Sequence, residues 1–197
     1  TIEASRVNGL VVGEDLGTVP DYVRTVLGEH GLLGCMVEWF ARVDDSPNAG
    51  DPYADPSTYR KYALASVTTH DLPPTAGYLQ FEHVKLREQL HLLSGPVEEF
   101  QASATAERDA MMDRLVESGL ITPEVAGDVE GHIQEIVEAM HKMLLKSPSV
   151  LLQAALVDGV GETRTQNQPG TSHDQYPNWC IPLTDAEGKA VLVEDLP

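Results

Sequence analysis

The stretch Val11-Val12-Gly13-Glu14-Asp15-Leu16-Gly17 places two adjacent carboxylates directly after a short apolar run. The run over 10–12 has no helical spacing, which is typical of a strand covered on both faces in a parallel sheet. Glycines on either side of the two carboxylates favour a turn. The stretch therefore predicts Glu14 and Asp15 at the carboxyl end of a buried strand.

A helix is predicted to follow this turn. Thr18 and Asp21 have the spacing of a capping box, apolar residues recur at helical spacing over 23–27, and Gly28 ends the pattern. A strand, a turn and a helix in this order form the repeating unit of parallel α/β folds.

The same alternation continues along the chain. Further strands are predicted over 35–40, 62–68 and 149–157, and polar loops over 44–56 and 162–179. Helices are predicted over 76–93, 96–119 and 123–146, the last with a long apolar stripe. The predicted fold class is α/β with a parallel sheet, in which functional residues gather at the carboxyl ends of the strands.

The charge balance limits the classes of partner. The 197 residues include 13 Lys and Arg against 31 Asp and Glu, a formal net charge of −18. Such a surface repels nucleic-acid phosphates and anionic lipids, and every apolar stretch is far shorter than the roughly 18 residues of a membrane span. We therefore expect no nucleic acid and no membrane as partners. Cys35 and Cys180 lack metal or redox spacing, so we expect free thiols and a cytoplasmic location.

Two polar pairs follow predicted strands, Glu14-Asp15 and His70-Asp71. Because parallel strands end at the same edge of a sheet, both pairs are expected to face one pocket. Retaining glycoside chemistry needs an acid that protonates the leaving oxygen, and burial among apolar strands raises the pKa of a glutamate into a suitable range. Each pair also has a simpler interpretation, as an ion-paired or helix-capping strand end or as an ordinary turn.

The sequence contains no glycine-rich nucleotide loop, no Gly-x-Ser-x-Gly elbow and no His-x-x-x-His pair. We therefore predict no cofactor and no metal site. Trp39 and Trp179 are candidates for stacking against a sugar, or for packing in the core or in a loop.

Taken together, these motifs resemble the amylomaltase, or disproportionating-enzyme, family of 4-α-glucanotransferases. The resemblance rests on Gly13 to Gly17, Gly34 to Phe40, Thr69-His70-Asp71, Asn167-x-Pro169-Gly170-Thr171 and Pro177-Asn178-Trp179. Each motif is weak alone, but their order and spacing make the combination specific. Among the departures, Cys180 stands where the family usually has arginine.

The resemblance implies a (β/α)8 barrel and the transfer of α-1,4-glucan segments between maltooligosaccharides or glucans derived from starch and glycogen. It implies that Glu14 is the general acid/base and that Asp71 stabilises the transition state. It also implies substrate-binding roles for His70 and Asn167, and Trp39 is added as a candidate sugar contact. Asp15 is expected to play a supporting or capping part.

The family's nucleophile, an aspartate after the fourth barrel strand, has no match, because the sequence has no aspartate before Asp15. The resemblance therefore implies a single catalytic-domain fragment over 1–197, the C-terminal half of the barrel with strands five to eight. A helical region over 76–147 would lie between the last two strands.

We expect this fragment to be inactive alone and to pair with the missing N-terminal half or with a second copy. The alternatives are a glucan-binding module without catalysis, an α-glucan hydrolase of the same barrel type, and a purely structural domain.

Overall fold

A computed structural model describes residues 2–43, 46 and 48–196, so part of the predicted loop over 44–56 lies outside the described residues. Its sheet has three parallel strands in the order β1-β2-β3. They are β1 (Gly34–Val37), β2 (Ala63–Ser66) and β3 (Leu151–Gln153). Gly34 pairs with Ala63, and Leu64 pairs with Leu151. The α/β fold with a parallel sheet is confirmed.

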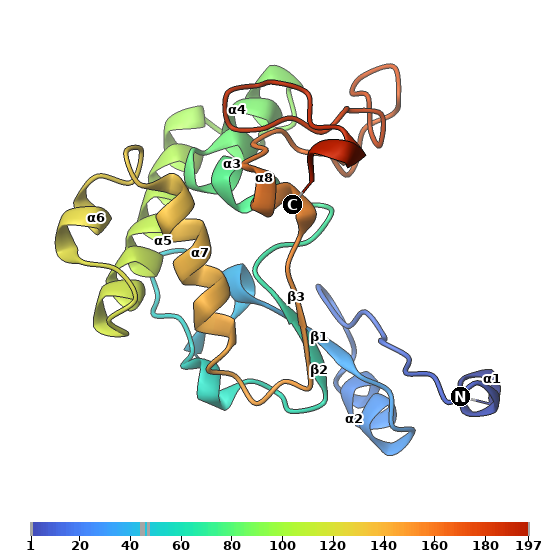
Figure 1. Cartoon of the computed structure of the whole chain (residues 1–197). Coiled ribbons are helices and arrows are strands. Elements are labelled where there is room, and N and C mark those ends of the chain that lie inside the picture. The colour runs from blue at the N-terminus through green and yellow to red at the C-terminus, as the bar shows by residue number, and fades with distance from the viewer. Residues whose placement is uncertain (1, 44–45, 47, 197) are drawn as a thin grey trace.

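The described residues also form a series of α-helices. They are α1 (Ile2–Arg6), α2 (Asp21–Glu29), α3 (Thr75–Leu79), α4 (Glu82–Gln89), α5 (Val97–Glu117), α6 (Pro123–Gly127), α7 (Ile133–Leu144) and α8 (Leu156–Val160). Short 3-10 helices are η1 (Glu38–Phe40), η3 (Pro56–Thr58) and η4 (Val193–Asp195). Figure 1 shows α3 to α8 gathered on the β3 side of the sheet, and α1 and α2 on the β1 side. Among the described helices, none is long and apolar enough to cross a membrane.

The core lies where α5 and α7 pack beside the sheet (Figure 1). The apolar stripe predicted over 123–146 is buried, as Ile136 and Met140 show with 0% exposure. The predicted continuous helix is wrong, because the chain leaves the helix between α6 and α7. There the side chain of Asp128 accepts a hydrogen bond from the backbone N–H of Gly131 at 3.2 Å and forms a turn in place of helical hydrogen bonds.

The segment over 10–12 is not the fully covered strand that was predicted. Val12 forms a single parallel bridge with Leu33, and residues 2–6 before it are helical. Leu10 is 69% exposed, so the expected burial on both faces is missing. An apolar run is buried in a sheet only when strands flank it on both sides, and within the described residues this run is hydrogen-bonded on the Leu33 side alone.

Other boundaries also differ from the predictions. The helix expected over 76–93 is divided into α3 and α4, because Phe81 between them has a φ of +63°. The strand expected over 35–40 turns into η1 after Val37, and the strand expected over 149–157 gives way to α8 at Leu156. The helix after the first turn begins at Asp21 with Pro20 as its N-cap, so Thr18 does not form the predicted capping box. Where a strand or helix ends early, the apolar pattern continues through a change of backbone conformation, which periodicity does not record.

Candidate functional site

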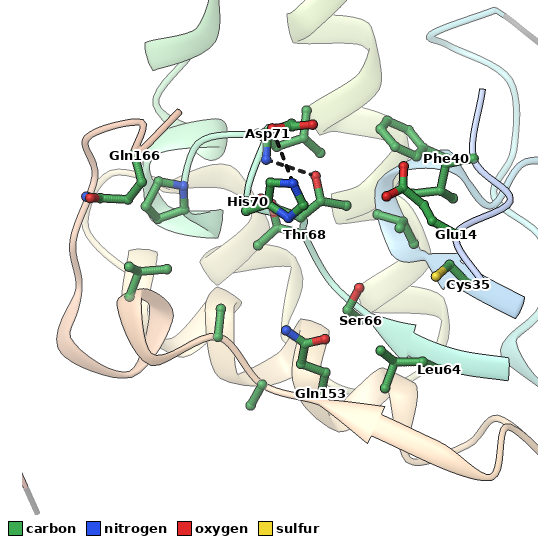
Figure 2. Close-up of a pocket in the computed structure, with 18 of the residues that line it drawn as sticks. Glu14, Cys35, Phe40, Leu64, Ser66, Thr68, His70, Asp71, Gln153 and Gln166 are labelled. Atoms are coloured by element: carbon green, nitrogen blue, oxygen red, sulfur yellow. Dashed lines mark hydrogen bonds and ion pairs between the residues drawn. The ribbon is translucent and has the colours of Figure 1, made fainter. Parts of the chain in front are cut away.

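A pocket of about 830 Å³ lies at the carboxyl ends of the strands. Figure 2 shows Glu14 and Phe40 on one side of it, Gln166 on the other, and His70 and Asp71 between them. Its lining includes Glu14, Val37, Phe40, Ser66, Thr68, His70, Asp71, Gln153, Leu156, Gln166 and Trp179. The structure thus brings Glu14 together with His70 and Asp71, although these residues are far apart in the sequence.

Asp71 is held by a partner from the C-terminal loop. The side-chain amide of Asn167 donates a 2.6 Å hydrogen bond to Asp71 Oδ1, and His70 Nε2 lies 3.4 Å from the same oxygen. The side chains of His70 and Asp71 are 61% and 46% exposed, so both are open to a molecule in the pocket. Three of the predicted site residues therefore form one connected group.

The loop over 69–74, which carries His70 and Asp71, is closed at its base. Thr68 Oγ1 donates to the carbonyl of Pro73 at 3.0 Å, and the backbone N–H of Asp71 donates to Thr69 Oγ1 at 3.3 Å. These hydrogen bonds hold the loop after β2, and with it Asp71, in one conformation.

Glu14 lines the same pocket from the opposite side (Figure 2). Its side chain is exposed, so the burial among apolar strands expected from the sequence is missing. The reason is the same as for the 10–12 run, since within the described residues only the Leu33 side of this segment is paired.

Asp15 has a different environment from its neighbour. It is 1% exposed and accepts hydrogen bonds from the backbone N–H of Cys35 at 2.8 Å and from Arg60 Nη1 at 2.5 Å. Burial alone would raise the pKa of Asp15, but the bonds from Arg60 and Cys35, with a charge contribution from Arg24, hold that pKa below its usual range. Asp15 is therefore an ion-paired structural carboxylate that ties the first turn to β1.

Trp39 lies in the core. It is 1% exposed and stacks on Tyr78 with ring centroids 4.3 Å apart. Its neighbour Phe40 is 49% exposed and lines the pocket in its place. This position gives Trp39 no surface for a sugar, so we do not propose it as a substrate contact. The reason is that η1 turns the chain after Val37, which directs the larger ring inward.

A buried ionic network around Glu38 was not predicted from the sequence. Glu38 is fully buried, its Oε1 lies 2.8 Å from Arg114 Nη1, and its Oε2 accepts from the Tyr59 hydroxyl at 2.9 Å. Burial raises the pKa of Glu38, although the positive charge of Arg114 opposes this change. The signal available in the sequence was a carboxylate inside an apolar run, which requires a partner when buried.

Two more buried carboxylates fix the segments around the pocket. Asp158 accepts from the backbone N–H of Thr75 at 2.6 Å and from its hydroxyl at 2.7 Å, so it joins α8 to the start of α3. Glu162 accepts from the Arg164 guanidinium at 2.7 Å and from the Thr184 backbone N–H at 2.9 Å. Isolated acidic residues in predicted loops gave no sequence signal for either role.

Metal ligation is not suggested by the described residues, which contain no group of three or more His, Cys, Asp or Glu side chains placed to share an ion. The polar groups that line the pocket include the carboxylates of Glu14 and Asp71, the His70 imidazole, and the side-chain amides of Gln153 and Gln166. Together they can donate protons to, accept protons from, and hydrogen-bond a hydroxyl-rich molecule.

Comparison with known proteins identifies relatives along nearly the whole chain. The family model for 4-alpha-glucanotransferase matches residues 1–187. A 4-alpha-glucanotransferase of Mycobacterium tuberculosis is 49% identical over 195 residues, which are 99% of this chain and 26% of that protein. One from Haemophilus influenzae is 31% identical over 186 residues, or 92% of this chain and 26% of that protein.

The crystal structure of amylomaltase from Corynebacterium glutamicum superposes with a TM-score of 0.88 at 41% identity. The match covers 98% of this chain and 27% of that one. This chain thus spans about a quarter of the length of the curated relatives it matches. By the match to the family model over residues 1–187, the chain belongs to the 4-alpha-glucanotransferase family.

Proposed function

We propose that this chain is the C-terminal part of a longer 4-α-glucanotransferase, which transfers α-1,4-glucan segments between maltooligosaccharides by a retaining double displacement. Family membership supports the reaction class. The observation that carries the proposal is the pocket itself, in which Glu14 faces the group formed by Asp71, His70 and Asn167.

In the proposed reaction Glu14 first acts as a general acid. It donates its proton to the glycosidic oxygen while the bond from that oxygen to the sugar C1 breaks and an aspartate of the upstream part attacks C1. The Glu14 carboxylate then accepts the proton of the acceptor's 4-hydroxyl, whose oxygen bonds to C1 and displaces the aspartate. Asp71 stabilises the positive charge that develops on the sugar ring in both steps.

His70 and Asn167 serve the same sugar unit in this proposal. An imidazole can donate to or accept from a ring hydroxyl, and the Asn167 amide holds the Asp71 carboxylate in one orientation. Both side chains act by position and exchange no proton with the substrate.

The three strands and the 10–12 segment are proposed to be strands five to eight of a (β/α)8 barrel. The helical region over 76–147 lies between β2 and β3, which would be strands seven and eight. Half a barrel leaves two sheet edges for other strands, and the exposed 10–12 run fits one of these edges. The preferred partner is the upstream half of the same protein, which would also supply the nucleophile. A second copy of this chain is the alternative.

The complete protein that carries this chain tests the proposal with maltotriose as the sole substrate. A transferase yields glucose together with longer oligomers, whereas a hydrolase yields only shorter products. We expect Glu14→Gln to lower kcat by about 10²–10⁴-fold, the usual contribution of a general acid. Near-normal turnover of this variant would remove Glu14 from the proposal.

Glucan binding without catalysis is a second candidate for the 197-residue chain by itself. The chain keeps Glu14, His70 and Asp71 around one pocket, with Asn167 hydrogen-bonded to Asp71, but has no aspartate before Asp15. Titration of the isolated chain with maltoheptaose should give binding heat and no product on thin-layer plates.

The cytoplasmic location of the protein stays a prediction from the unpaired Cys35 and Cys180.

A further inference from the structure

Trp179 is a large aromatic residue of the pocket to which the proposed mechanism gives no role. Its side chain is 62% exposed, although tryptophan is normally well buried, and it lines the same pocket as Glu14 and Asp71. Its ring lies beside that of His70, with centroids 5.5 Å apart and planes inclined by 41°. A large apolar surface therefore adjoins the polar group at Asp71.

The backbone at Trp179 adopts an unusual conformation. Its φ is +63°, in the left-handed region that residues with a Cβ seldom occupy. The conformation is maintained by hydrogen bonds on both sides, from Trp179 N to the Gln166 carbonyl at 2.9 Å and from Cys180 N to the Pro177 carbonyl at 3.0 Å. Unfavourable backbone conformations persist where the surrounding structure determines them, and they occur often at functional sites.

The loop before Trp179 is tied together by its own side chains. Asn178 Oδ1 accepts from the Gln168 backbone N–H at 2.8 Å, and Asn178 Nδ2 donates to Thr171 Oγ1 at 2.9 Å. The Tyr176 hydroxyl donates to the Thr165 carbonyl at 2.5 Å. These hydrogen bonds hold the loop, and with it the Trp179 indole, in one position.

The same loop also holds Asp71, through the 2.6 Å bond from Asn167. Trp179 and Asp71 are therefore fixed relative to one another by one segment. A ligand that contacts the Asp71 carboxylate meets the indole as a neighbouring wall of the pocket.

We propose that Trp179 is a substrate-binding residue, whose indole stacks against the C–H face of a glucosyl unit bound next to the one at Asp71. Hexopyranose rings have an apolar C–H face and a rim of hydroxyls, so an aromatic surface beside carboxylate, imidazole and amide groups matches them. The inference rests on the proposed function, because it assumes that the occupant is an α-glucan. The alternative is that Trp179 packs against the upstream part of the protein.

Two substitutions in the complete protein separate these roles. Trp179→Phe keeps an aromatic face, and Trp179→Leu keeps an apolar side chain that can pack but cannot stack. We expect W179L to raise the KM for maltoheptaose about tenfold with little change in kcat, because a contact made equally in the ground and transition states affects KM alone. We expect W179F to stay within about threefold of the wild-type KM.

Thermal melting of the same variants is the second readout, and it shows whether each one folds. Equal KM values for wild type, W179F and W179L would overturn the inference while leaving the transferase function intact. A lower Tm in W179L with an unchanged KM would assign Trp179 to packing and also overturn it. Wild-type protein that neither transfers nor binds maltoheptaose would instead refute the proposed function, and the inference with it.

Discussion

The side-chain amide of Asn167 donates a 2.6 Å hydrogen bond to the carboxylate of Asp71, a residue 96 positions earlier in the sequence. The bond connects the segment after β3 to the loop after β2, and the Asp71 side chain is still 46% exposed. Because the same oxygen lies 3.4 Å from His70 Nε2, Asp71 is oriented from two sides.

Removing this bond should reduce catalysis in the complete protein. We expect Asn167→Ala to lower kcat/KM about tenfold, because a hydrogen bond to a charged group typically contributes ~1.5 kcal/mol or more. Asn167→Asp should be more damaging, since it places a second negative charge against Asp71. Gln89→Ala, an exposed change at the end of α4, is the matched control. Initial-rate kinetics with maltotriose would contradict this view if N167A and Q89A gave the same values.

Two helical glycines give opposite predictions for stability. A Cβ at Gly77 in α3 would lie 2.0 Å from the carbonyl oxygen of Thr163, whereas a Cβ at Gly28 in α2 would meet no atom within 4 Å. Backbone contacts of this kind cannot move aside cheaply, so we expect Gly77→Ala to destabilise the fold by about 2 kcal/mol or more. Gly28→Ala should be stabilising by roughly 0.5–1 kcal/mol, because alanine loses less backbone entropy in a helix. Urea unfolding of the two variants checks this, and a similar effect of both would contradict the close packing of α3.

Acid should weaken the attachment of the C-terminal segment. Burial opposes ionisation of Glu162, but hydrogen bonds from Arg164 and Thr184 outweigh it and lower its pKa from 4.5 to about 2. Because the pKa of Glu162 is lower in the folded state, its ionised form stabilises the fold at pH values above the unfolded-state pKa of about 4.5. This contribution is lost as the pH falls from about 4.5 towards 2.

Glu162→Gln tests this dependence. We expect the variant to have a lower Tm at pH 7 and a smaller further decrease between pH 5 and roughly 2 than the wild type, because one carboxylate no longer takes up a proton on unfolding. Melting curves across that range measure both effects. Parallel pH profiles for the two proteins would show that Glu162 is not ionised in a stabilising site.

The sequence motifs predicted the site residues more accurately than the apolar periodicity predicted the helices and strands. Glu14, His70 and Asp71 could be placed at one pocket because each follows an apolar run, and parallel strands end at a common edge. The stripe of α7 was equally readable, since one face of an amphipathic helix repeats every three or four residues. The 10–12 run misled for a physical reason. Its residues have strand character, but its burial depends on neighbours that the described chain supplies on one side only.

The sequence by itself determined the family and the residue types at the strand ends, because these are carried by short motifs in a fixed order. Only the tertiary structure showed that Glu14 lines the pocket while Asp15 beside it does not, and that both His70 and Asp71 line it. Asp15 is buried because Arg60, 45 positions away, reaches it, while Glu14 beside it stays exposed. Trp39 is buried against Tyr78, and Trp179 is held out beside His70. Local sequence patterns record neighbours within a few residues, whereas each of these outcomes depends on contacts between distant segments.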